Sequence, residues 1–315
     1  MARSSQNSLK SQIPHALNET LILITGDEIL IGFQYTAVFN KSFAQFPSFV
    51  QDLQLVGLVL LLLALILVMS PVPFDRIAER GLASRRLCHF VRWAILAALL
   101  PFSLGLAIDV YVIAQKIGGQ TLGLIAAIVV GLTAIGFWYV LEFVRRSMKG
   151  YGRMNTNQGD EDHVEHVELS EKIEHVLGEV RVVLPGAQAL LGFQFISVLS
   201  EGFDTLSQTS KYLHLFSLGL IAFSTILLMT PAAYHRIVDE GEDTEHFHRL
   251  AGAFILAAMI VLALGIIINF YIVVDRVTAS LPLAISSAGI MLLVFYGFWF
   301  GYTWYRRRTR KPAQK

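Results

Sequence analysis

The sequence has little charge and almost no cysteine. Of its 315 residues, 16% are charged and one is a cysteine, Cys88. A single cysteine excludes a disulfide within the chain, and it excludes zinc or iron–sulfur sites built on several thiolates. The formal net charge is +1, so no surplus of positive charge indicates a nucleic-acid partner. These absences argue against a disulfide-stapled, thiolate-metal or nucleic-acid-binding protein.

Motifs of the common enzyme classes are also missing. The chain contains none of the patterns HExxH, GxxxxGK[ST], GxSxG and GxGxxG, which mark metalloproteases, P-loop proteins, hydrolases and dinucleotide-binding domains. His163 and His166 have the spacing of one helix face, but the acidic residues around them indicate a solvated helix rather than a zinc site. We therefore predict no enzymatic activity, no cofactor and no bound metal.

The sequence is instead rich in long apolar runs. It is 54% hydrophobic, its mean hydropathy is +0.57, and a membrane-spanning helix needs about 20 mostly apolar residues. Between Leu53 and Met69 only Gln54 is strongly polar. The pattern predicts an all-α, polytopic membrane helical bundle with eight transmembrane helices. Their expected ranges are 20–42, 53–73, 92–115, 120–144, 180–202, 211–233, 250–274 and 280–304.

The chain matches itself when it is shifted by 160 residues. Gly32-Phe33-Gln34 aligns with Gly192-Phe193-Gln194, and the same offset pairs Met69 with Met229, Pro71 with Pro231, Gly105 with Gly265 and Tyr111 with Tyr271. Apolar helices match by chance, but shared glycines, prolines and glutamines at one offset do not. We predict two parallel four-helix repeats, residues 1–149 with an N-terminal tail and 175–315 with a basic tail, joined by an acidic cytoplasmic linker, 150–174.

The distribution of basic residues predicts the orientation in the membrane. Because each repeat has an even number of helices, both repeats begin on the same side of the membrane. The two repeats are then expected to be related by an axis along the membrane normal. The side that carries both termini holds 21 Lys and Arg residues, and the opposite side holds only Lys41, Lys116, Lys211 and Arg276. Cytoplasmic loops are enriched in Lys and Arg. The protein is therefore expected in the cell inner (plasma) membrane, multi-pass, with cytoplasmic N and C termini.

The first predicted helix of each repeat is interrupted at the same place. One copy reads Thr25-Gly26-Asp27-Glu28 and the other Pro185-Gly186-Ala187-Gln188. Proline and glycine weaken a helix, and paired interruptions in two halves point to a binding site in transporters. One interpretation is a broken helix that faces a polar cavity. The other is a kinked, partly amphipathic helix near the cytoplasmic interface.

The two copies differ in charge at matching positions. Glu28 aligns with Gln188 and Asp109 with Asn269, so only the first copy can ionise there. Acidic residues inside a membrane are costly and usually functional. Glu28 is the leading predicted proton or cation site, and the further candidates are Asp27, Gln34, Gln188, Gln194, Asp109 and Asn269. For Asp109, an exposed acid near the outer surface is the favoured alternative.

A second shared motif follows the second helix of each repeat. It reads Pro-x-x-(Phe/Tyr)-x-Arg-Ile, and its candidate residues for a cytoplasmic gate or a lipid-headgroup anchor are Arg76, Tyr234, His235 and Arg236. Headgroup anchoring alone explains the motif, because an arginine beside an interfacial ring reaches the headgroups. A gate or a partner site is the alternative.

The second copy resembles an uncharacterised family of small bacterial four-helix membrane proteins. The resemblance is carried by Gly186, Gln188, Pro231, Tyr234, His235 and Arg236. In the first copy Glu28 replaces the glutamine, and Phe74-Asp75-Arg76 replaces Tyr-His-Arg. Family members usually carry one unit, so the resemblance implies a tandem duplication. Some members are labelled sodium:proton antiporter, which implies ion-coupled transport.

Two functions remain open from the sequence. The first is a secondary transporter coupled to protons or sodium, with polar groups lining the interface between the halves. The second is a non-transporting membrane scaffold or stress-related interaction protein. The expected partners are the lipid bilayer and a monovalent cation or proton, with a homo-oligomer as a further expectation and no nucleic acid. In a transporter Glu28 and Gln188 are expected to converge on a polar cavity, and in a scaffold they are expected at the surface or in a solid core.

Overall fold

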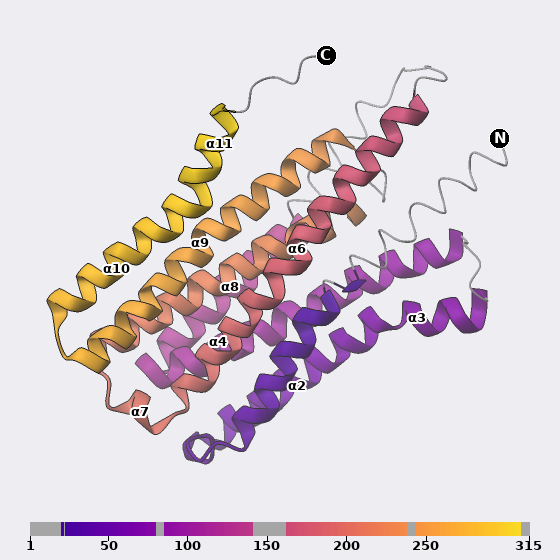
Figure 1. Ribbon diagram of the computed structural model, residues 1–315. Coiled ribbons are helices and arrows are strands. Elements are labelled where there is room, and N and C mark those ends of the chain that lie inside the picture. The colour runs from indigo at the N-terminus through magenta and orange to yellow at the C-terminus, as the bar shows by residue number, and fades with distance from the viewer. Residues whose placement is uncertain (1–19, 22, 80–84, 141–161, 238–243, 310–315) are drawn as a thin grey trace.

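The computed structural model describes residues 20–21, 23–79, 85–140, 162–237 and 244–309. Within these ranges all regular secondary structure is helical (Figure 1). The first helix covers residues 20–21 and 23–38. It is followed by η1 (Phe43–Gln45), α2 (Ser48–Met69), α3 (Pro71–Phe74), η2 (Asp75–Glu79), α4 (Arg85–Ile135), η3 (Gly136–Val140), α6 (Asp162–Val198), α7 (Glu201–Asp204), α8 (Gln208–Ile237), α9 (Glu245–Thr278), α10 (Leu281–Tyr296), η4 (Gly297–Tyr302) and α11 (Thr303–Thr309).

The helices are apolar on their outer surface as well as in the core. Among the described residues, six helices are long and apolar enough to cross a membrane. On α2 the buried face includes Leu61 and Val68, while Leu63 and Ile66 on the other face are exposed. A helix in water has a polar outer face, whereas a helix in lipid is apolar all round. These helices fit an integral membrane protein, as the composition predicts.

The helix α4 is a hairpin of two helices rather than one rod. Its backbone leaves the helical region at Gly118 and Gly119, and Gly119 has φ 82°, a left-handed conformation that favours glycine. A Cβ at Gly131 would lie 3.4 Å from the Cβ of Ala107. Further along, the Tyr139 hydroxyl donates to Leu96 O over 2.6 Å. The two arms therefore run antiparallel, as predicted for the segments around 92–115 and 120–144.

The same close helix contact occurs once in each half of the chain. A Cβ at Gly105 would lie 2.8 Å from Leu61 and 3.3 Å from Gly57 O. At Gly265, 160 residues later, a Cβ would lie 2.7 Å from Ile221 and 3.3 Å from Ser217 O. Small residues let membrane helices approach closely. The pairs α2–α4 and α8–α9 therefore cross in the same way, which is consistent with a two-part repeat.

The fourth helices of the two halves have different surroundings. The η3 segment that ends the α4 hairpin packs on α8, and Trp138 Nε1 donates to Ile226 O over 3.1 Å. The helix α10 packs on α9 and lies at the edge of the bundle (Figure 1), with Leu293 70% exposed. In this respect the arrangement departs from the predicted symmetry about a membrane-normal axis.

The helix α6 decides between the two interpretations of the interrupted helices. It runs without a break from Asp162 to Val198, with Pro185 inside it, so the second half of the predicted linker and the fifth predicted span form one helix. The first helix is also continuous across Gly26 and Asp27. Of the two interpretations of these segments, the broken helix is therefore wrong. Buried Leu184, on α6, and Leu30, on the first helix, pack in the shared core, and tertiary packing overrides local helix propensity.

We expect the paired glycine contact to be needed for stability in both halves. Replacing Gly105 or Gly265 by alanine places a methyl group against Leu61 or Ile221, and such overpacking costs about 1–3 kcal/mol. Gly252, also on α9, has open space at its Cβ position, so Gly252→Ala is expected to stabilise by up to about 1 kcal/mol. Thermal unfolding of the purified protein in detergent measures all three. Equal melting temperatures for Gly265→Ala and Gly252→Ala would contradict the contact.

Candidate functional site

The phase of the first helix decides which of its polar residues reach the core. Its buried face carries Asp27 and Gln34, which are 1% and 2% exposed. They are seven residues apart, which is two helical turns, so they lie on the same face. Glu28 is offset by about 100° from that face, at 3.6 residues per turn, and is exposed.

Three helices meet at Asp109 of α4. The Gln34 side chain of the first helix donates from Nε2 to Asp109 Oδ1 over 2.7 Å. The Gln54 side chain of α2 donates from Nε2 to the same oxygen over 3.0 Å. Asp109 is 3% exposed, so the predicted exposed position of this acid is wrong. The two amide groups allow the carboxyl group to be buried, since buried polar groups need hydrogen bonds.

Polar atoms beside this carboxyl group remain unsatisfied. Asp109 Oδ2 and Gln34 Oε1 are both buried without a hydrogen-bond partner among the described residues. A cavity of about 20 Å³ is lined by Phe33, Gln34, Ala37, Gln54, Asp109, Val112, Ile113, Phe195 and Leu199. That volume is sufficient for one water-sized occupant. Phe195 belongs to α6 and Leu199 directly follows it, so the cavity lies between the two halves of the chain.

At the equivalent position in the second half the glutamine amide nitrogen bonds to a hydroxyl instead of a carboxylate, while Gln194 Oε1, like Gln34 Oε1, has no partner among the described residues. Gln194 Nε2 donates to Ser217 Oγ over 2.9 Å, and that hydroxyl donates to Gly265 O over 2.8 Å. His214, which aligns with Gln54, lies with Nε2 3.2 Å from Gln194 O. Asn269, which aligns with Asp109, is half-buried. Gly57 stands where the second copy has Ser217, so Gln34 has no hydroxyl there and turns to Asp109.

The structure does not bring Glu28 and Gln188 together. Glu28 is exposed, whereas Gln188 is fully buried. The Gln188 amide lies against Gly26, where there is no room for a Cβ. Gln188 Nε2 and Oε1 have no hydrogen-bond partner among the described residues. The expected convergence on a polar cavity is therefore absent for this pair, and its arrangement matches the solid core expected of a scaffold.

The candidates for a gate or a headgroup anchor are described only in part. Tyr234 is 1% exposed, and its ring stacks on Phe247 with centroids 6.1 Å apart. This tyrosine packs in the core and is not exposed to headgroups. The side chains of Arg76, His235 and Arg236 lie outside the described residues.

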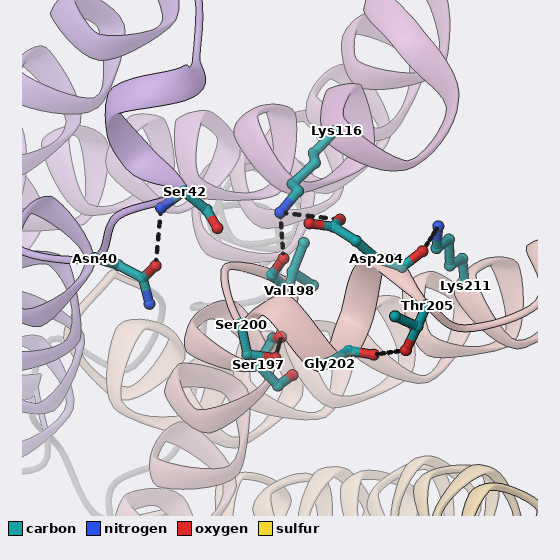
Figure 2. Close-up of polar contacts among 10 residues, drawn as sticks. All are labelled: Asn40, Ser42, Lys116, Ser197, Val198, Ser200, Gly202, Asp204, Thr205 and Lys211. Atoms are coloured by element: carbon teal, nitrogen blue, oxygen red, sulfur yellow. Dashed lines mark hydrogen bonds and ion pairs between the residues drawn. The ribbon is translucent and has the colours of Figure 1, made fainter.

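A polar clasp joins the two halves just beyond the cavity. Lys116 Nζ, at the end of the first arm of α4, donates to Val198 O over 2.7 Å and lies 3.3 Å from Asp204 Oδ1 of α7 (Figure 2). Gln208 Nε2 donates to Ile117 O over 3.1 Å. Two residues that line the cavity adjoin this clasp: Ile113 lies about one helical turn before Lys116, and Leu199 directly follows Val198. The clasp therefore holds the cavity walls together at this end.

Comparison with protein families identifies the chain. A model of a family of unknown function (DUF6328) matches it twice, over residues 4–142 and 162–303. This chain belongs to the DUF6328 family. The double match is consistent with a two-part repeat. No curated protein and no solved structure matches the chain.

One residue of the Asp109 cluster, Gln54, was not among the candidate site residues predicted from the sequence. Gln54 is the single strongly polar residue of the second apolar run, and that isolation was a usable signal. Its partner Asp109 lies 55 positions away in the chain, so spacing alone does not pair them. In the described part of the chain no group of three or more His, Cys, Asp or Glu residues could hold a metal ion.

The clasp residue Lys116 is expected to stabilise the contact between the halves. Its side chain is 16% exposed and that of Asp204 51%, so the ion pair itself contributes little. The charge-assisted bond to the buried end of α6 is worth about 1.5–3 kcal/mol. Lys116→Met is expected to lower the melting temperature, and Lys41→Met, at an exposed lysine, to leave it unchanged. Equal melting temperatures for Lys116→Met and Lys41→Met would show that the clasp does not stabilise the protein.

Proposed function

We propose that this DUF6328 protein is a secondary transporter that exchanges protons for a monovalent cation at Asp109. The observation that carries the proposal is the unpartnered pair of oxygens, Asp109 Oδ2 and Gln34 Oε1, beside a cavity of about 20 Å³. Carboxylate and amide oxygens are the ligands that hard cations prefer. The same carboxylate can instead bind a proton.

Exchange follows from competition for one negative charge. A sodium ion beside Asp109 requires the carboxylate form, while a proton on Oδ2 removes the charge that holds the cation. Leaving a carboxylate empty at this depth is costly, because an unpaired charge in a low-dielectric site is poorly solvated. The site therefore favours one occupant at a time, which is the property that coupled exchange needs.

The membrane arrangement of the proposal has eight spans. The two arms of the α4 hairpin count separately, and the first helix is added to the six candidate spans. The end that carries α11 and the start of α6 lies opposite α7 and the α9–α10 turn (Figure 1). By the distribution of Lys and Arg, the first end faces the cytoplasm of the plasma membrane. Asp109 then lies nine residues before Gly118, roughly 13 Å from the outer end.

A membrane scaffold is the second candidate function. The observation that favours it is the packing of Gln188 against Gly26, with Glu28 exposed on the surface. In a scaffold the Asp109 cluster serves only to tie three helices together. The two functions differ in one measurable property, which is ion movement.

Flux measurements in proteoliposomes test the exchange. With a sodium gradient and a pH-sensitive dye inside the vesicles, the wild type is expected to move protons against sodium, and Asp109→Asn to lose this movement. The amide is isosteric and its oxygen still accepts from Gln34 and Gln54, so the fold is expected to persist. Asp52→Asn is the matched control, since Asp52 is an exposed acid on α2.

The variant Glu28→Gln separates the two locations of the site. Exchange at Asp109 predicts that Glu28→Gln keeps wild-type flux, whereas loss of flux in this variant alone would place the site at the exposed acid. Absence of sodium-dependent proton movement in folded wild-type protein would reject the transporter and favour the scaffold.

A further inference from the structure

A second carboxyl group, besides Asp109, is buried in the bundle. Asp27 on the first helix is 1% exposed, and neither of its oxygens has a hydrogen-bond partner among the described residues. It is seven residues before Gln34, which corresponds to about 10 Å along the helix. In the proposed orientation the carboxyl group therefore lies closer to the cytoplasmic end of the bundle than the Asp109 cavity does.

The cavity beside Asp27 is apolar. Its side chain adjoins a cavity of about 10 Å³ lined by Leu23, Asp27, Ala64, Val68, Ala98, Leu99, Phe102 and Met229. These residues come from the first helix, α2, α4 and α8, so both halves of the chain contribute. The lining side chains other than Asp27 offer no oxygen ligand. A metal cation in such a cavity would lose its hydration shell without replacement, since hard cations require several oxygen ligands.

The charged groups near Asp27 do not supply a counter-ion. The lining residues from α2, α4 and α8 are all uncharged. The nearest titratable group on its own helix is Glu28, which is also acidic and is exposed. A carboxylate at Asp27 would therefore stand unpaired in an apolar site, whereas the protonated acid carries no charge and is far less costly to bury.

The second half of the chain shows what this position needs for packing alone. Ala187 aligns with Asp27 and is fully buried. Ser224 aligns with Ala64, and its hydroxyl donates to Ala258 O over 2.9 Å. The fold thus accommodates alanine at this point of the helix, and packing does not require a carboxyl group.

We propose that Asp27 is a second ion site that binds a proton and no metal cation, and that it relays protons to the Asp109 cavity. The relay, though not the proton site itself, rests on the proposed exchange at Asp109. Asp27 and Gln34, which donates to Asp109, lie on one face of the first helix. A small rotation or tilt of that helix therefore alters both sites together. The first half of the chain then holds two sites of different selectivity, one for protons alone and one for protons or sodium.

Infrared spectroscopy of the full-length protein in detergent tests the site directly. The carbonyl stretch of a protonated carboxyl group is separate from the bands of carboxylates and amides. The wild type is expected to show a protonated-carboxyl band that Asp27→Asn loses and that added sodium leaves unchanged. The wild type is also expected to show a protonated-carboxyl band from Asp109, which is assigned by its loss in Asp109→Asn. In the wild type this band is expected to disappear when sodium is added. Glu201→Gln, at an exposed acid, is expected to match the wild type.

Asp27→Ala, which installs the residue of the second copy, repeats the measurement with a side chain that this fold accommodates. An unchanged protonated-carboxyl region in both Asp27 variants would overturn the proton site. A sodium-sensitive Asp27 band would overturn its selectivity.

Proton flux in proteoliposomes tests the relay. Flux is expected to be lost in Asp27→Asn, although sodium still removes the Asp109 band in that variant. Retained flux in Asp27→Asn would overturn the relay. If sodium leaves the Asp109 band unchanged and the wild type shows no flux, the exchange at Asp109 fails while the Asp27 band still decides the proton site.

Discussion

The fold of the first half depends on satisfying one carboxyl group at membrane depth. Lipid offers no hydrogen bonds, so each polar side chain in the bundle must find a partner in the protein or bear a large cost. Asp109 finds two, because Gln34 and Gln54 both donate to its Oδ1. These bonds connect the first helix and α2 to α4. The same bonds leave Oδ2 and Gln34 Oε1 unsatisfied, so the interaction that orders the helices also leaves two unpartnered oxygens beside the cavity.

Close approach of the helices makes this cluster possible. A Cβ at Gly57 would lie 3.0 Å from Ile108 and 3.4 Å from Gln34 Nε2, so a side chain there would press on Ile108 and contact the amide that reaches Asp109. The second half has Ser217 at the matching position, and its hydroxyl takes the Gln194 amide instead. One small residue thus decides whether the glutamine closes on α8 or reaches across to the acid. The chemistry of each half follows from its helix packing as much as from its acids.

The presence of long apolar helices and of a two-part repeat could be predicted from the sequence, because apolar length and the 160-residue offset can be read directly from the residues; the ends of the helices could not, since α6 begins at Asp162 rather than near residue 180. The location of the buried acids could not be predicted in the same way. Comparison of the two copies singled out Glu28 through its charge, but the helical period turns Glu28 outward and Asp27 inward. Asp109 was placed near the outer surface from its depth alone. Its burial depends on Gln34 and Gln54, 75 and 55 positions away in the chain, and no local pattern records such contacts.

A two-part repeat within one chain explains how buried acids can be confined to one half. Two identical copies would bury an acid at every equivalent position, and each unpaired charge adds a cost in the membrane. In one chain the two copies vary independently, so Ala187 can oppose Asp27 and Asn269 can oppose Asp109. The neutral half keeps the helix crossing at Gly265 that matches Gly105, and its Phe195 and Leu199 complete the wall of the cavity. The second half therefore contributes to the cavity wall without an acid at either position, and the cost of buried carboxyl groups is confined to the first half.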